Sequence, residues 1–220
     1  KKIIFGAPKE LIRLFYDSED IITTCTIVED YDYFIPVQSL GKLLLSTSAP
    51  IDKYISIDEK DIKFSKAVMA NEVYKLEIDS KNKQLVAINW KGNPEHAKDK
   101  IRSLSLIDMI EQVKADNRIL FSVQYNPTDQ EKQIMKNNNI IDLSPYIRDL
   151  YDTAGFFKNM NYIVSIDSAP AHLAGAIGTR TMLLMPQNHE DYRWGSDGKK
   201  KLYESLSVIR FNLKWCLQIT

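Results

Sequence analysis

Cysteine and histidine are scarce in this 220-residue sequence, and the few present do not form a metal-binding pattern. The two cysteines, Cys25 and Cys216, lie far apart without a CxxC partner, which excludes the usual zinc-site spacing. Two thiols in so long a chain favour a reducing compartment, although a disulfide between them stays open. Of the three histidines, His189 lacks a second imidazole at ligand spacing. We therefore expect no metal at the functional site.

An excess of charge of either sign is also absent. Lysine plus arginine number 29 and aspartate plus glutamate number 29, so the formal net charge is zero. This balance argues against electrostatic binding of nucleic acid and against a polybasic membrane anchor. Apolar runs are too short to span a membrane, and the beginning of the sequence does not resemble a secretory signal. We expect a cytoplasmic globular protein with no membrane span and no nucleic-acid partner.

The second half of the sequence alternates short apolar runs with helical patterns. The apolar runs at 85–88, 119–123, 162–166 and 182–185 are typical of strands buried on both faces of a parallel sheet. Candidate helices follow Ser103, Thr128 and Asp152 as N-caps, and another helix at 171–177 is stopped by Gly178. This alternation predicts a right-handed α/β arrangement with a Rossmann-like sheet.

The first half is less regular. It contains candidate strands at 3–5, 21–26 and 43–45 and one candidate helix at 10–16. These elements are too few for a complete doubly wound domain, and 65–79 is expected to cross into the second half. We predict a reduced α/β domain over 1–80 and a Rossmann-like domain over 81–220.

The most informative segment runs from Ile166 to Gly175, where an apolar strand ends and a short helix of small residues begins. Pro170 suits the first turn of a helix, because its missing N–H costs nothing there. The pattern places a helix N-terminus at the carboxyl edge of a parallel sheet, where its free amides suit a phosphate. The alternative is an ordinary strand-to-helix turn in which Ser168 is the cap.

A second polar segment follows the strand at 85–88. It contains a loop with glycine, asparagine and proline, and then a basic stretch that includes Lys98, Lys100 and Arg102. Arg102 could bind a diphosphate through bidentate hydrogen bonds. A solvated basic turn is the competing interpretation, and it suits Lys98 and Lys100 better than Arg102.

Together, five motifs in this order resemble the glycosyltransferase family 9 module, which is heptosyltransferase-like, in the branch found beside tetratricopeptide repeats. They are WKGN with a following RS, FSVQY, DTA, DSAPAHLAGAIG and DYRWG, spanning about residues 84–210. The DSAPAHLAGAIG block is the most specific. Gln124 stands at the L-Q position, and Tyr192 replaces the first tryptophan of a W-R-W motif.

The resemblance implies a bacterial protein with a GT-B fold, in which the second domain binds a nucleotide-diphosphate sugar. On this reading Asp167, Ser168 and Ala169 line the diphosphate end, with His172 one turn into the helix. Lys100 or Arg102 neutralises the leaving diphosphate, Gln124 approaches the ribose or base, and Trp90, Gly92 and Asn93 form the pocket wall. Transfer is inverting, needs no metal or other cofactor, and goes to a hydroxyl of a glycan or protein acceptor.

The N-terminal part of the sequence departs from the family pattern. The family's general base normally lies in a Gly-Asp loop after the first strand, and this sequence has no such loop. We expect that strand, loop and helix to be absent, which makes the catalytic residue unknown. A non-catalytic nucleotide-sugar-binding module, completed by a partner chain or a fused repeat domain, is therefore the alternative to an enzyme. A sugar-nucleotide epimerase ranks below both, because no set of acidic groups suits it.

Three further features have competing interpretations. Asp30-Tyr31-Asp32 matches the D-x-D of metal-dependent glycosyltransferases, but a three-residue match is common by chance. Arg193 and Trp194 are either a lid over the ligand or a packing pair. His172 either contacts the ligand or makes a structural hydrogen bond.

Overall fold

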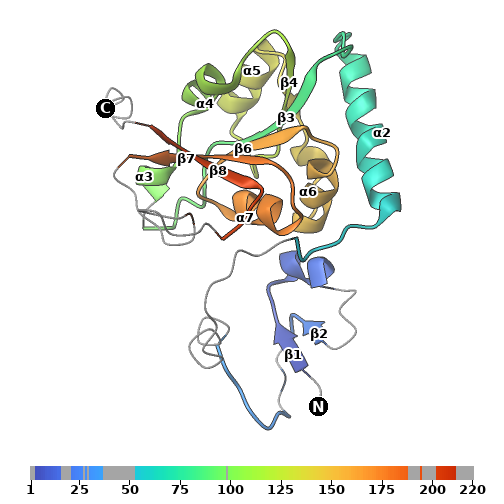
Figure 1. Cartoon of the computed structure of the whole chain (residues 1–220), viewed down its shortest axis with the longest axis vertical. Helices are drawn as coiled ribbons and strands as arrows, with labels where there is room; N and C mark the ends of the chain where they lie inside the picture. Colours follow the sequence, from blue (N-terminus) through green and yellow to red (C-terminus); the bar gives the residue numbers. More distant parts are fainter. Residues whose placement is uncertain are drawn as a thin grey trace.

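The computed structural model describes residues 3–15, 21–26, 28, 30–36, 53–97, 99–187, 194 and 202–211. A parallel sheet of six strands forms its larger unit (Figure 1). The strands are β3 (Gln84–Asn89), β4 (Arg118–Ser122), β5 (Ile141–Asp142), β6 (Tyr162–Ile166), β7 (Thr181–Pro186) and β8 (Leu206–Phe211). They lie in the order β5-β4-β3-β6-β7-β8, which is the 3-2-1-4-5-6 order of a doubly wound Rossmann sheet when counted from β3.

All four strands predicted in the second half are present. Their apolar runs are unbroken because both faces of the sheet are covered: Val86 and Ile88 pack on one face and Ala87 on the other. The sequence pattern missed β5, which has two residues, and β8, an edge strand whose exposed positions are partly polar. Short and edge strands bury less apolar surface, so their sequence signal is weak.

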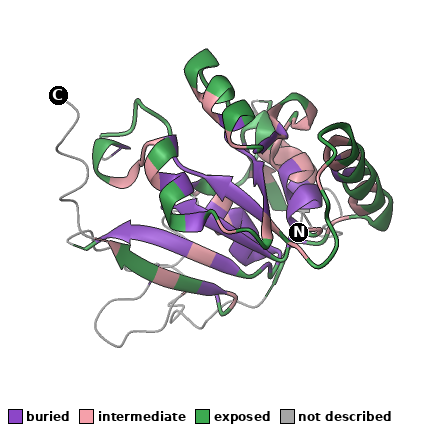
Figure 2. Cartoon of the chain, turned by 90° about the horizontal axis from the view of Figure 1, so that it is seen from above, coloured by how far each residue is buried: buried purple, intermediate pink, exposed green. Residues whose placement is uncertain are grey.

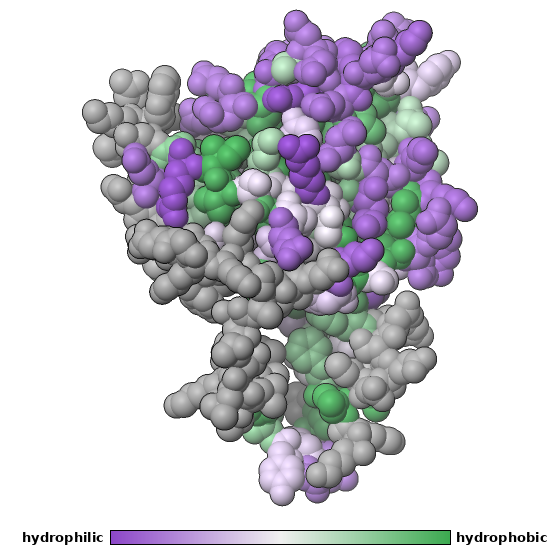
Figure 3. All heavy atoms as spheres, viewed as in Figure 1, coloured by the Kyte–Doolittle hydropathy of each residue, from purple (hydrophilic) through white to green (hydrophobic). Residues whose placement is uncertain are grey.

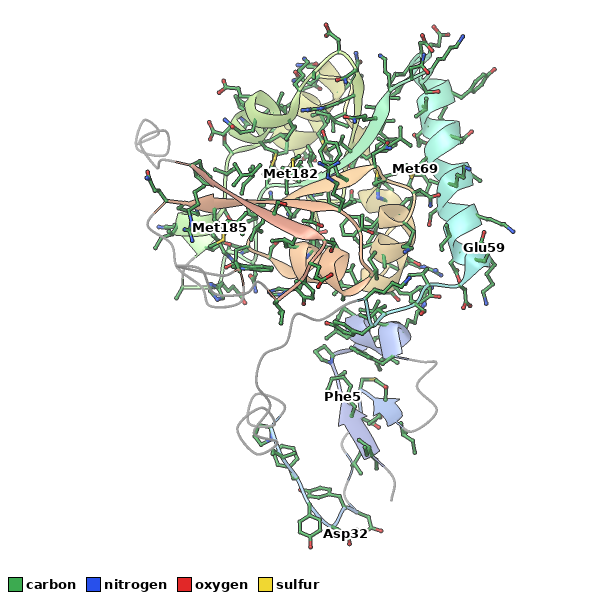
Figure 4. All side chains as sticks on the ribbon, in the orientation of Figure 1. Phe5, Asp32, Glu59, Met69, Met182 and Met185 are labelled. Atoms are coloured by element: carbon green, nitrogen blue, oxygen red, sulfur yellow. The ribbon has the colours of Figure 1, made fainter. Side chains whose placement is uncertain are left out.

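Helices cover both faces of the sheet. α4 (Leu106–Val113) and α5 (Asp129–Asn137) pack on the face that carries Val86. α2 (Glu59–Lys75), α6 (Leu150–Phe157) and α7 (Ala169–Ala176) pack on the other face, and Met69 points from α2 into that core (Figure 4). Figure 2 shows the buried strands between these helices, with the outer side of α2 exposed. This architecture is the predicted α/β class with a Rossmann-like second half.

The helix caps confirm two sequence predictions and correct two others. Thr128 caps α5 in a capping box with Glu131, and Gly178 follows α7 at φ +73°, as expected of a helix stop. The cap of α4 is Ser105 rather than Ser103, and the cap of α6 is Asp149 rather than Asp152. Serine and aspartate are both common N-caps, and in each case two such residues lie within three positions of each other, so local sequence left the choice between them open.

A smaller unit precedes the parallel sheet. β1 (Ile3–Gly6) pairs in parallel with β2 (Ile21–Thr24), and the predicted helix at 10–16 is the 3₁₀ helix η1 (Lys9–Phe15). In Figure 3 apolar residues reach the surface of this unit, where Ile3, Ile4 and Ile22 are exposed. The predicted strand at 43–45 lies outside the described residues.

The chain joins the larger unit well before residue 80. The backbone N–H groups of Tyr54 and Ile55 donate to the carbonyl of Ala176, and the side chain of Ser65 on α2 packs against Gly155 of α6. Ile55 and Met69 belong to the same core as the sheet. Residues 53–78 thus pack with the parallel sheet, whereas the sequence pattern suggested a boundary near residue 80.

Candidate functional site

The candidate site lies where the strand order reverses, between β3 and β6. These strands are neighbours in the sheet although two other strands separate them in sequence, and the crossovers that follow them leave in opposite directions. Ligands of open α/β sheets bind outside the carboxyl ends of the strands at this point. Here β3 ends at Asn89 and β6 ends at Ile166, directly before the DSAPAH sequence.

Four buried polar side chains meet at this point and form a continuous network. Asn89 donates from Nδ2 to Oε1 of Gln124 at 2.9 Å, and its Oδ1 accepts from the hydroxyls of Ser168 at 2.7 Å and Ser165 at 3.2 Å. All four residues are less than 8% exposed. The network ties together the ends of β3, β4 and β6. Asn89 is its central member, and the sequence analysis assigned it no role, although a polar residue ends an apolar strand there.

Gln124 lies in a different environment from the predicted one. Its Oε1 also accepts from the backbone N–H groups of Trp90 and Lys91, at 3.2 and 3.0 Å, and its Nε2 donates to the carbonyls of Lys91 and Tyr125. These bonds use both donors and the acceptor of the amide. Gln124 therefore fixes the loop after β3 and has no hydrogen-bonding group left for a ribose or base.

The W-K-G-N loop and the R-S pair of the motif contact each other directly. The N–H of Gly92 donates to the hydroxyl of Ser103 at 3.0 Å, and the N–H of Leu104 donates to the carbonyl of Trp90 at 2.8 Å. A Cβ on Gly92 would lie 2.4 Å from Nη2 of Arg102. A side chain at this position would therefore displace the guanidinium of Arg102 and the carboxylate of Asp99, and glycine leaves both in place.

Arg102 is held at the carboxyl edge of the sheet from two sides. Its Nε lies 3.2 Å from Oδ1 of Asp99, and its Nη1 donates to the carbonyl of Asp167 at 2.8 Å. Within the part of the chain that the structure describes, Nη2 has no acceptor. The guanidinium thus connects α3 (Asp99–Arg102) to the turn after β6, and one nitrogen is left to bind an anion.

Trp90 is fully buried and does not form the surface of a pocket. Its Nε1 donates to Oε1 of Glu131 at 2.7 Å, and Lys91 forms an ion pair with Oε2 of the same carboxylate. Burial alone would raise the pKa of Glu131, but the bonds from Lys91, Thr128 and Trp90 outweigh it and lower that pKa. Glu131, which the sequence analysis did not single out, anchors the loop to the first turn of α5.

The turn after β6 begins helix α7 without a side-chain cap. Ser168 occupies the N-cap position, yet its hydroxyl donates to Asn89 and accepts no N–H of the helix. In the described residues, the backbone N–H groups of Ser168 and Ala169 have no acceptor. Asp167 and Ser168 are 5% and 7% exposed, whereas Ala169 is exposed. The first residue of the helix therefore lies at the protein surface.

His172 lies among aromatic rings one turn into the same helix. Its Nδ1 is 3.2 Å from the hydroxyl of Tyr203, and its ring stacks on Trp194 with centroids 4.3 Å apart. Trp194 is 1% exposed, which fits a packing residue and not a lid. Gly175 contacts Tyr203 so closely that a Cβ would lie 2.3 Å from the ring. The small residues of the AHLAG sequence thus accommodate Tyr203, which the sequence analysis overlooked.

The remaining predicted residues lie at the surface or outside the described part. Asn93 and Lys100 are exposed, and Asn93 accepts the N–H of Glu95 in a local turn. Lys98, His189, Tyr192, Arg193 and Cys216 lie outside the described residues. The D-x-D sequence belongs to the smaller unit, and Figure 4 shows Asp32 at the end of that unit away from the sheet.

The described residues contain no group of three or more histidine, cysteine or acidic side chains placed to hold a metal ion. They also contain no helix with the length and apolar character needed to cross a bilayer.

Comparison with known proteins finds structural neighbours only, since no family model and no curated protein matches the sequence. The chain is similar to ADP-heptose LPS heptosyltransferase II of E. coli (12% identity, 76% of this chain and 49% of that one, TM-score 0.47). It is also similar to a glycosyl transferase family 9 protein of Veillonella parvula DSM 2008 (12% identity, 80% and 47%, TM-score 0.49). The chain spans about half the length of either structure, and the similarity at this identity concerns the fold alone.

Proposed function

We propose that this chain binds the diphosphate of a nucleotide-activated sugar at the carboxyl ends of β3 and β6. One observation carries the proposal: at the switch point of a Rossmann sheet, the amides of Ser168 and Ala169 and the Nη2 of Arg102 have no hydrogen-bond partner among the described residues. Helix N-termini and guanidinium groups are the usual phosphate ligands of proteins. The order of the five sequence motifs supports the same proposal, because the W-K-G-N, R-S and DSAPAH segments hold one another in place.

The proposed reaction is inverting, metal-independent transfer of the sugar to a hydroxyl of a glycan or protein acceptor. In such a reaction the helix amides and Arg102 stabilise the departing nucleotide, and a base deprotonates the acceptor. A bacterial cytoplasmic setting and a partner chain or fused repeat domain belong to the proposal through the sequence resemblance.

Binding without transfer is the second candidate, and the state of the acidic groups favours it. Asp99 pairs with Arg102, and Glu131 pairs with Lys91. A general base works best with a pKa near the operating pH, whereas the pKa of Glu131 is lowered. Neither carboxylate suits the role, so a base would have to come from another part of the protein or from a partner.

Removal of a single backbone N–H tests the binding site. Ala169→Pro removes that donor at the first helical position, where proline fits and where the preceding Ser168 is already extended, with φ −154° and ψ 171°. Losing a hydrogen bond to a charged group should weaken binding of ADP, GDP, UDP or CDP about tenfold or more in calorimetric titrations. Ala169→Ser keeps the N–H and is the matched control.

The wild-type chain should first show a rise in melting temperature with at least one of these diphosphates. At ten times the dissociation constant the stabilisation is about 1.4 kcal/mol, or roughly 3–6 °C for a chain of this size. No shift at millimolar concentrations, or equal affinity of the proline and serine variants, contradicts the site. Incubation of the nucleotide sugar with hydroxyl acceptors then separates transfer from binding alone.

A further inference from the structure

We infer that Asn89 is a positioning residue, which keeps the helix amides of the site open by drawing the hydroxyl of Ser168 away from α7. The inference rests on the proposed function, because it concerns the diphosphate site described above. Asn89 is 2% exposed, so it acts through its neighbours and does not itself touch a ligand.

The direction of the hydrogen bonds follows from the backbone. Oε1 of Gln124 accepts two backbone N–H groups, which fixes the orientation of its amide. Asn89 must therefore present its Nδ2 to that oxygen and its Oδ1 to the other side of the switch point. A carbonyl oxygen can only accept, so the hydroxyl of Ser168 is the donor in the 2.7 Å bond.

This bond has a consequence for the first turn of α7. A serine at the N-cap normally accepts the N–H of the second or third helical residue, and here the second is Pro170, which has none. Ala171, the third residue, donates instead to the carbonyl of Ser168 at 3.0 Å. Because Asn89 holds the hydroxyl, which also lies 3.3 Å from the carbonyl oxygen of Ile166, the Ser168 side chain does not occupy the position in front of the helix, where it would compete with a phosphate.

The same side chain sets the spacing of the two halves of the site. Asn89 Nδ2 also lies 3.3 Å from the carbonyl of Lys91, at the start of the loop that covers Arg102. One buried amide thus connects this loop, which follows β3, to the Ser168 turn, which follows the neighbouring strand β6. A side chain of the same size that lacked either the donor or the acceptor would keep the hydrogen bonds to only one of these two segments.

A double-variant cycle on the full chain tests the inference, with inorganic pyrophosphate as the probe because the base of the nucleotide is unidentified. In Asn89→Ala the freed hydroxyl should cap α7 and weaken pyrophosphate binding about fivefold, the usual strength of an N-cap. In the Ser168→Ala background, Asn89→Ala should change the affinity by less than about twofold. Thr181→Val, which removes a buried hydroxyl from the opposite end of the sheet, is the control.

The crystal structure of Asn89→Ala gives a readout that needs no ligand. The hydroxyl of Ser168 should lie within about 3.2 Å of the Ala171 nitrogen. Equal losses from Asn89→Ala in both backgrounds, or a serine hydroxyl still directed away from the helix, overturn the inference. If the wild-type chain binds no pyrophosphate while the serine rotates as expected, the proposed function fails and the inferred diversion of Ser168 stands. Asn89→Ser, which is too short to reach both loops, replaces the alanine variant if that does not fold.

Discussion

At the scale of single residues, the glycines of the motifs serve contacts inside the protein. Gly175 faces the ring of Tyr203, and Gly92 faces the guanidinium of Arg102. Each of these glycines leaves room for a larger neighbour: Arg102, which donates to the turn after β6, and Tyr203, which contacts His172 of α7.

Gly175→Ala should destabilise the protein by roughly 1–3 kcal/mol, since overpacking a filled core forces neighbours to move. The new Cβ would lie 2.3–2.7 Å from ring carbons near the root of Tyr203, which is 4% exposed and cannot swing away. Urea unfolding measures the change. Gly6→Ala, where nothing lies within 4 Å, is the control and should stay within about 0.5 kcal/mol of wild type. Similar values for both variants would contradict the packing role.

At the scale of elements, the first turn of α6 gathers several charges. Asp149 caps the helix, and Asp152 forms ion pairs with Arg13 at 2.9 Å and Arg148 at 2.8 Å. Burial alone would raise the pKa of Asp152, but the hydrogen bonds from Arg148 and Arg13 lower it to about 2. Asp152 belongs to the DTA motif, so this motif contributes an ion-pair cluster rather than a ligand contact.

This cluster predicts an acid-sensitive part of the stability. The folded pKa of Asp152 is about 2, below the ordinary unfolded value of about 3.9, so the stabilisation is present above pH 4 and disappears as the pH falls toward 2. Asp152→Asn should lower the free energy of unfolding at pH 7 by roughly 2 kcal/mol and flatten its dependence between pH 5 and 2. Urea titrations across that range measure it, with Asp129→Asn, an exposed side chain, as control. An unchanged slope would show that Asp152 is not a main acid-sensitive group.

At the scale of the whole molecule, the two units are joined through η1. Arg13 donates to both Asp149 and Asp152 and lies 4.5 Å from the centre of the Tyr151 ring, while Leu14 enters the core below α6. The two-stranded sheet of β1 and β2 is too small to be stable alone. Its order therefore depends on this contact with the larger unit.

Arg13→Ala should loosen the smaller unit and leave the parallel sheet folded. Hydrogen exchange should become at least tenfold faster in η1 and β1, whereas β3 and β6 should keep their protection, because local opening follows local contacts. Lys9→Ala, at the exposed start of η1, is the matched control. Uniformly faster exchange over the whole chain would mean that the two units unfold together.

The sequence alone determined the four long central strands, the α/β class and the position of the turn at Asp167, because buried parallel strands and helix starts have local patterns. The helix start at Thr128 and the stop at Gly178 were likewise readable, since each depends on residues a few positions apart. The tertiary structure decided which residues share the switch point. Asn89 lies 35 positions from Gln124 and 79 positions from Ser168 along the chain, and it is hydrogen-bonded to both. Only the 3-2-1-4-5-6 strand order brings the three residues together. It also turned Trp90 and Gln124 inward, because burial and hydrogen-bond satisfaction depend on neighbours that a single stretch of sequence does not contain.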